Sequence, residues 1–95
     1  MKNIFLSLFA LCSLTIGSNA LAESYLCSSA SIERSIDVVY ATEGYPTPCE
    51  VQYSKNGETH TLWSAENEAG YCEAKAKELA DKLAQAGWSC RVTNP

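Results

Sequence analysis

The sequence predicts an α+β fold, a small antiparallel sheet in the order β-β-β-α-β with one helix packed on one face and two disulfides. Three observations support this prediction. An Asn-Gly pair separates two alternating segments, a later Ala- and Lys-rich stretch has helical apolar spacing, and four of the five cysteines follow the N-terminal apolar run. A chain of 95 residues that is 46% hydrophobic has room for one small domain.

The first 22 residues have the pattern of a secretory signal peptide. Lys2 precedes an apolar run over residues 4–16, and Ala20-Leu21-Ala22 forms a small-residue cleavage site before Glu23. A membrane helix is the alternative, but this run is shorter than the roughly 20 apolar residues that span a bilayer. We therefore expect a bacterial Sec signal peptide, a single domain over residues 23–95, and a location in the periplasm or the medium.

Cleavage changes both the charge and the cysteine count. It removes one base, Lys2, and no acid, so the formal charge falls from −4 to −5. It also removes Cys12 and leaves four cysteines, an even number that is typical of disulfides in small exported domains. An acidic surface favours a basic protein partner over nucleic acid or an anionic membrane, although solubility alone also explains it. We expect no membrane span after cleavage.

The first half of this domain is expected to contain one strand between two loops. Glu23 to Ser31 is polar and Ser-rich, so we expect a loop tied down at Cys27. Ile32 to Ala41 alternates between apolar and polar residues, which predicts a half-buried strand. Thr42 to Pro48 contains one glycine and two prolines and is expected to be a loop.

Cys49 to Trp63 is expected to form a hairpin, because Asn56-Gly57 is the preferred pair for a two-residue type I′ turn. That loop length predicts four cross-strand pairs: Lys55 with Glu58, Tyr53 with His60, Val51 with Leu62, and Cys49 with Ser64. This register places Leu62 on the apolar face of the sheet. Trp63 then lies beside Glu50 on the polar face.

The last part of the chain is expected to form a helix and a short strand. The helix begins between Glu66 and Tyr71 and ends near Ala86, with Gly87 as its left-handed terminator. Its solvent side is expected to carry two ion pairs, Glu73 with Lys77 and Glu78 with Lys82. Trp88 to Val92 alternates as the final strand.

Four cysteines allow three pairings, and geometry ranks them. Cys49 and Cys72 are expected at the same end of the sheet and facing each other. Cys72 is expected to lie about 20 Å from the end of the helix, and the last strand returns only about 10 Å of this distance before Cys90. Cys72 and Cys90 are therefore too far apart to form a disulfide. We therefore predict the disulfides Cys49–Cys72 and Cys27–Cys90.

No residue pattern in the chain carries a specific chemistry. The cysteines are separated by 22, 23 and 18 residues, whereas zinc sites and thiol oxidoreductases use close pairs, so we expect no metal, no cofactor and no catalytic residue. His60 is the single histidine, and we expect a partly buried structural role beside Tyr53 rather than a base or metal ligand.

Two places are candidates for a binding surface. Trp63 on the polar face beside Glu50 suggests a contact surface, unless the N-terminal segment or a neighbouring strand covers it. The loop with Tyr45 and Pro46 is the second candidate, because prolines stiffen it and loops often carry function. A plain strand connection is the alternative for this loop.

Four short strings suggest a family: Pro48-Cys49-Glu50-Val51, Leu62-Trp63-Ser64-Ala65, Gly70-Tyr71-Cys72-Glu73-Ala74-Lys75-Ala76 and Gly87-Trp88-Ser89-Cys90. With these strings, Arg34 to Cys90 resembles small secreted disulfide-containing proteins of proteobacteria to which no function is assigned. The resemblance implies export and disulfides, and it implies no catalytic residues.

Three functions remain open. The first is a non-enzymatic binding module, an inhibitor of a basic envelope or secreted protein among them, because the Gram-negative periplasm holds small disulfide-bonded inhibitors of lysozymes and proteases with this general build. The second is an accessory structural subunit of an envelope complex, which requires an apolar surface patch. The third is a small hydrolase that uses His60, which requires a pocket holding His60 and a carboxylate.

Overall fold

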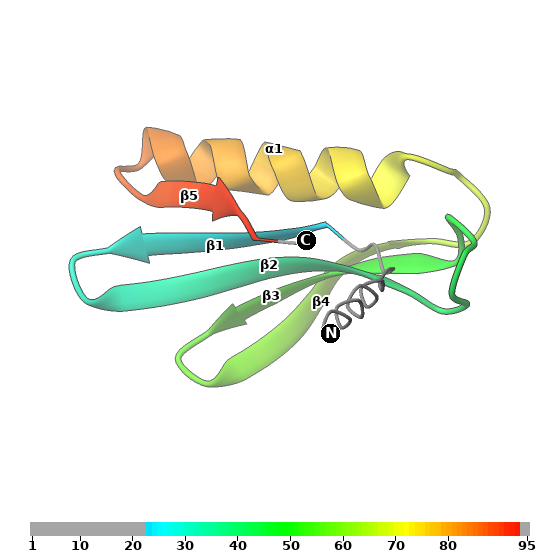
Figure 1. Ribbon diagram of the computed structural model, residues 1–95, viewed down its shortest axis with the longest axis horizontal. Coiled ribbons are helices and arrows are strands. Elements are labelled where there is room, and N and C mark those ends of the chain that lie inside the picture. The colour runs from blue at the N-terminus through cyan, green and yellow to red at the C-terminus, as the bar shows by residue number, and fades with distance from the viewer. Residues whose placement is uncertain (1–22, 94–95) are drawn as a thin grey trace, which may run out of the picture.

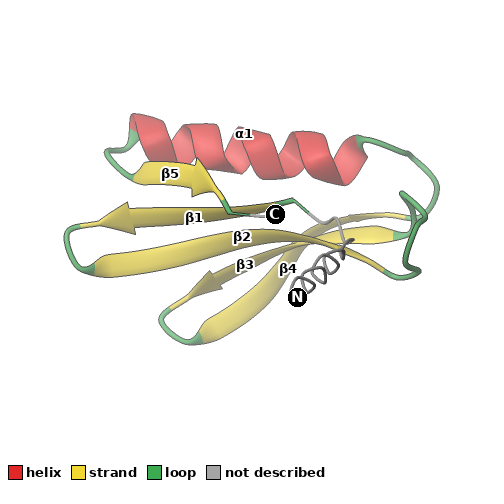
Figure 2. Cartoon of the chain, viewed as in Figure 1, coloured by secondary structure: helices red, strands yellow, loops and turns green. Residues whose placement is uncertain are grey.

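The computed structural model describes residues 23–93, which form a five-stranded antiparallel sheet with one helix on one face (Figures 1 and 2). The strands are β1 (Ser24–Ser29), β2 (Ile32–Tyr40), β3 (Cys49–Lys55), β4 (Glu58–Ala65) and β5 (Ser89–Val92), and the helix is α1 (Tyr71–Gln85). Their order across the sheet is β4-β3-β2-β1-β5. The predicted α+β class is confirmed, whereas the predicted signal peptide lies outside the described residues.

The described chain begins with a strand, so the prediction of a loop over Glu23 to Ser31 is wrong. β1 pairs with β2 on one side and with β5 on the other. A two-residue turn, Ala30-Ser31, connects it to β2, and Ala30 has a φ of 56°. Alanine rarely adopts a positive φ because its Cβ meets the backbone. The turn therefore lacks the Asn or Gly residues from which a hairpin is recognised.

The β3–β4 hairpin has the predicted turn, but its register changes halfway along. Lys55 faces Glu58 and Tyr53 faces His60, as predicted. A β-bulge between Val51 and Gln52 then adds one residue to β4, so Val51 faces Trp63 and Cys49 faces Ala65. The predicted pairs of Val51 with Leu62 and of Cys49 with Ser64 are wrong. Because side chains alternate along a strand, the extra residue turns Trp63 toward the core.

The core lies between the helix and the sheet. Three small helix residues, Cys72, Ala76 and Ala80, are buried against the side chains of β1, β2 and β3. The helix ends as predicted: Gly87 has a φ of 106°, and the Trp88 N–H donates to the Leu83 carbonyl over 2.9 Å.

Both predicted disulfides are confirmed. Cys49–Cys72 joins the start of β3 to the first turn of α1, and Cys27–Cys90 joins β1 to β5. Three of these four residues, Cys27, Cys49 and Cys72, are almost completely buried. The bridges are therefore part of the core.

Candidate functional site

Two loops lie at the same end of the sheet (Figure 1). Residues 41–48 connect β2 to β3, and residues 66–70 connect β4 to α1. The Cys49–Cys72 disulfide joins the two elements that follow these loops, with the Cα atoms 6.3 Å apart. The loops contain three glutamates, Glu43, Glu66 and Glu68, and no Lys, Arg or His. We call residues 41–48 and 66–70 the acidic end.

Tyr45 is the large side chain that the acidic end presents to solvent. It is 64% exposed, and the neighbouring Pro46 is also exposed. The loop is closed at its base, where the Ala41 N–H donates to the Pro48 carbonyl over 3.0 Å. Tyr45 and Pro46 therefore have the exposure that a binding role requires, and that role stays a prediction.

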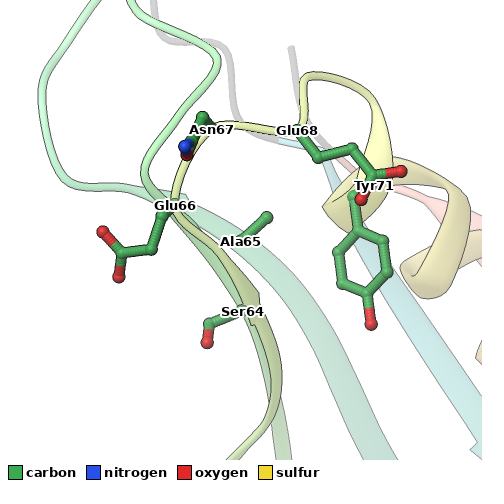
Figure 3. Close-up of a pocket in the computed structure, with 6 residues that line it drawn as sticks. All are labelled: Ser64, Ala65, Glu66, Asn67, Glu68 and Tyr71. Carbon is green, nitrogen blue, oxygen red and sulfur yellow. The ribbon is translucent and has the colours of Figure 1, made fainter.

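A shallow, open depression lies beside α1 at this end (Figure 3). Its lining residues are Ser64, Ala65, Glu66, Asn67, Glu68 and Tyr71. In Figure 3 the Glu66 carboxylate lies on the side of the loop away from Tyr71, whereas Glu68 extends toward the helix. The two carboxylates therefore do not converge on one point, as a pair performing acid–base chemistry would.

Trp63 and Glu50 do not form the joint surface that the sequence suggested. Glu50 is exposed on the face away from the helix, where it accepts hydrogen bonds from Gln52 over 3.2 Å and from Thr61 over 3.3 Å. Trp63 is half-buried on the helix side, and the Lys75 Nζ lies 5.2 Å from its ring centre. The prediction that Trp63 lies on the polar face is wrong, because of the β4 bulge.

Behind the acidic end, a partly buried contact joins β2 to the first turn of α1. The Tyr40 hydroxyl donates a hydrogen bond to the Glu73 Oε2, and the Glu73 Oε1 is buried without a partner among the described residues. Burial, and secondly the bond to Glu73, raises the pKa of Tyr40 well above its usual value. Sequence reasoning missed this contact because it placed Glu73 on the solvent side.

The helix surface therefore carries different ion pairs from those predicted. Lys77 pairs with Asp81 over 3.1 Å rather than with Glu73. Glu78 pairs with Lys75 over 3.2 Å rather than with Lys82. Lys77, Glu78 and Asp81 are exposed, whereas Lys75 is half-buried beside Trp63. Ion pairs of this kind along a helix contribute little to stability.

His60 is exposed, and the prediction of a partly buried position is wrong. Its side chain is 54% exposed, and its Nε2 lies 3.3 Å from the Glu58 Oε1. It faces Tyr53 across the hairpin as predicted, but β4 is an edge strand that the helix leaves open at this end. His60 lines neither the depression beside α1 nor a second one between the two hairpin turns.

The exposed large apolar side chains of residues 23–93 are spread over three strands and one loop. They are Ile32, Val39, Tyr45, Leu62 and Val92. Within the same residues, no group of three or more His, Cys, Asp or Glu could hold a metal ion. The described part of the chain also has no helix with the length and apolar character needed to cross a membrane.

Comparisons of this chain with protein families, with curated proteins and with solved structures find no match.

Proposed function

We propose that this chain is an exported, non-enzymatic binding module whose acidic end engages a basic surface of another protein. The observation that carries the proposal is the acidic end itself: its two loops contain three glutamates, no basic residue and an exposed tyrosine. Charges of one sign steer an oppositely charged partner and set its orientation, while tyrosine supplies contact area at low entropic cost.

Rigidity supports the same proposal. The Cys49–Cys72 disulfide and the Tyr40–Glu73 hydrogen bond both lie at the base of the acidic end. A surface that is already ordered before binding loses less conformational entropy when the partner docks.

Export is the second part of the proposal. Two disulfides fit an oxidising compartment outside the cytoplasm. Intact mass of the protein purified from its native envelope, without reductant, tests this part. We expect a chain that begins at Glu23 and is four hydrogens lighter than its reduced form, as two disulfides require. An uncleaved chain with free thiols would contradict export.

The binding part is tested with the oxidised domain as immobilised bait for periplasmic and secreted proteins. The loop variant combines Glu43→Gln, Glu66→Gln and Glu68→Gln, and a second variant carries Tyr45→Ala. We expect a basic protein that the native domain retains, that salt releases, and that the loop variant binds about tenfold more weakly. The loss follows from removing three charges at the interface.

The matched control variant combines Glu33→Gln, Glu58→Gln and Asp81→Asn. It changes the net charge by the same amount at exposed positions outside the acidic end. Retention by the control together with loss by the loop variant supports the proposal. Equal retention by both variants would show that net charge alone attracts the partner, and it would refute the assignment of the acidic end.

A further inference from the structure

In contrast to the acidic end, the other end of the sheet carries a cluster of positively charged and aromatic side chains around Arg34 of β2. The guanidinium carbon of Arg34 lies 4.3 Å from the centre of the Trp88 ring, and its Nη1 donates to the Tyr53 hydroxyl over 2.8 Å. The Lys55 Nζ lies 5.8 Å from the centre of the same Tyr53 ring. We call Arg34, Tyr53, Lys55 and Trp88 the cation–aromatic corner.

The corner lies on the helix side of the sheet, near the end of the helix. Its Lys55 is exposed, Arg34 and Trp88 are half-buried, and Tyr53 is buried. Arg34 faces Cys27 across β1 and β2, and Cys27 is fully buried in the core, so Arg34 projects from the same face. The helix has already ended at Gln85, before Trp88. Figure 1 shows this end of α1 at the same end of the molecule as the turn between β1 and β2. Ile32, on the same face, is 54% exposed.

The two cations of the corner lack a carboxylate partner within residues 23–93. The ion pairs found there involve His60, Lys75 and Lys77. Glu58 faces Lys55 across the hairpin but lies against His60 instead. In a chain with eleven acidic and seven basic residues, this arrangement is unexpected. Two like charges beside one ring repel each other, and an incoming carboxylate would relieve this repulsion.

Arg34 is also held in a geometry that suits recognition. The Trp88 ring covers one face of the guanidinium, and the Tyr53 hydroxyl takes one of its five N–H donors. The other donors form a planar fork that matches the two oxygens of a carboxylate. Stacking has already removed much of the rotamer freedom that an unsupported arginine would lose on binding.

We propose that the cation–aromatic corner binds an acidic segment of a protein partner, in which a carboxylate adjoins an apolar side chain. Arg34 and Lys55 receive the carboxylate, and Trp88 with Ile32 receives the apolar group. Trp, Tyr and Arg are the residue types that dominate binding hot spots. This surface is separate from the acidic end and has the opposite charge preference, so either assignment can fail without the other.

The test uses two matched peptides and the oxidised, processed chain. In one peptide Glu alternates with Leu, and in the other Gln replaces every Glu. Each is titrated to millimolar concentration while nuclear magnetic resonance follows the backbone amides and the Trp88 indole N–H. We expect the Glu peptide to shift Trp88 and residues near Arg34 and Lys55. Binding should weaken about tenfold with the Gln peptide or with the Arg34→Gln chain.

Arg91→Gln is the matched control, since it removes the same charge from the other face of the sheet. Arg91 pairs with Leu26, whereas the corner shares the face of Cys27. Lys55→Gln, at an exposed site, provides a second variant in case Arg34→Gln lowers stability. Retained spectral dispersion and oxidised mass show that each variant folds.

Four results would overturn the proposal: equal binding of both peptides, equal binding by Arg34→Gln and the native chain, shifts confined to residues outside the corner, or no shifts. Concentration-dependent shifts of the corner in the absence of peptide would assign it to contact with a second copy of the chain, and would equally refute a separate partner.

Discussion

At the scale of single residues, the contact between Tyr40 and Glu73 shows how one hydroxyl can hydrogen-bond a partly buried carboxylate. The Tyr40 hydroxyl is the hydrogen-bond donor to Glu73, whose other oxygen is buried without a partner among the described residues. A buried acceptor that loses its donor carries the full cost of desolvation. Glu73 also lies in the first turn of α1, where the helix dipole favours a negative charge.

Tyr40→Phe is therefore expected to lower the free energy of unfolding by about 1–3 kcal/mol at neutral pH. The variant also changes the response to alkali. Burial and the bond to Glu73 raise the pKa of Tyr40 in the folded chain, whereas an unfolded tyrosine ionises near pH 10. The contribution of Tyr40 is thus full below about pH 10 and is lost as the pH rises further. Urea unfolding at neutral and alkaline pH measures both effects.

Tyr45→Phe is the matched control for this prediction, because the Tyr45 side chain is 64% exposed. It should change the free energy of unfolding by less than about 0.5 kcal/mol. Tyr25 also has a raised pKa, mainly through burial, so some alkaline loss remains in the Tyr40→Phe chain. If the Tyr40→Phe and native chains lose stability in parallel above pH 10, the hydrogen bond to Glu73 does not govern this titration.

At the scale of elements, the bulge in β4 decides which of two adjacent apolar residues joins the core. Leu62 and Trp63 are neighbours, so a regular strand would bury one and expose the other. The extra residue near Val51 gives the inner position to Trp63 and leaves Leu62 41% exposed. A tryptophan buries more apolar area than a leucine, and this gain favours the bulged register.

The bulge predicts unequal effects of two alanine substitutions. Trp63→Ala should lower the free energy of unfolding by about 2–4 kcal/mol, somewhat less than a fully buried tryptophan, because the side chain is half-buried. Leu62→Ala should lower it by less than about 1 kcal/mol. Chemical unfolding of the two variants provides the comparison, and each serves as the control for the other. A larger loss for Leu62→Ala would support the regular register instead.

At the scale of the whole molecule, two disulfides hold a sheet whose first and last strands are neighbours. Cys27 and Cys90 are 63 residues apart in the chain, and their bridge joins β1 to β5. Cys49 and Cys72 are 23 residues apart. A small domain buries limited apolar surface, so cross-links supply much of its net stability.

Chain entropy predicts the order of their contributions. The longer loop should stabilise by about 4 kcal/mol and the shorter by about 3 kcal/mol. Thermal or urea unfolding of the oxidised variants Cys27→Ala/Cys90→Ala and Cys49→Ala/Cys72→Ala tests this order. Reduction of both bridges is expected to unfold the domain. If the variant without Cys49–Cys72 is the less stable one, native packing around that buried bridge outweighs loop length.

Sequence patterns predict those parts of the fold that depend on near neighbours. Asn56-Gly57 places the hairpin turn, and Gly87 ends the helix, because each depends on a positive φ angle at one residue or at two adjacent residues. The disulfides follow from the lengths of the intervening elements. β1 escapes prediction because the Ala30-Ser31 turn has no such residue, and its pairing with β5 joins segments far apart in the chain.

Some residues of the candidate surfaces can likewise be predicted from local sequence, whereas the positions of others depend on the tertiary structure. Tyr45 and Pro46 can be found in the sequence, since an exposed loop between regular elements keeps its residues in solvent. The position of Trp63 depends on a bulge, and the partner of Glu73 lies 33 residues away at Tyr40. Arg34 of β2 and Trp88, which precedes β5, meet because β1 lies between these two strands and pairs with both. Side chains distant in sequence become neighbours through cooperative packing of the sheet, which no local pattern contains.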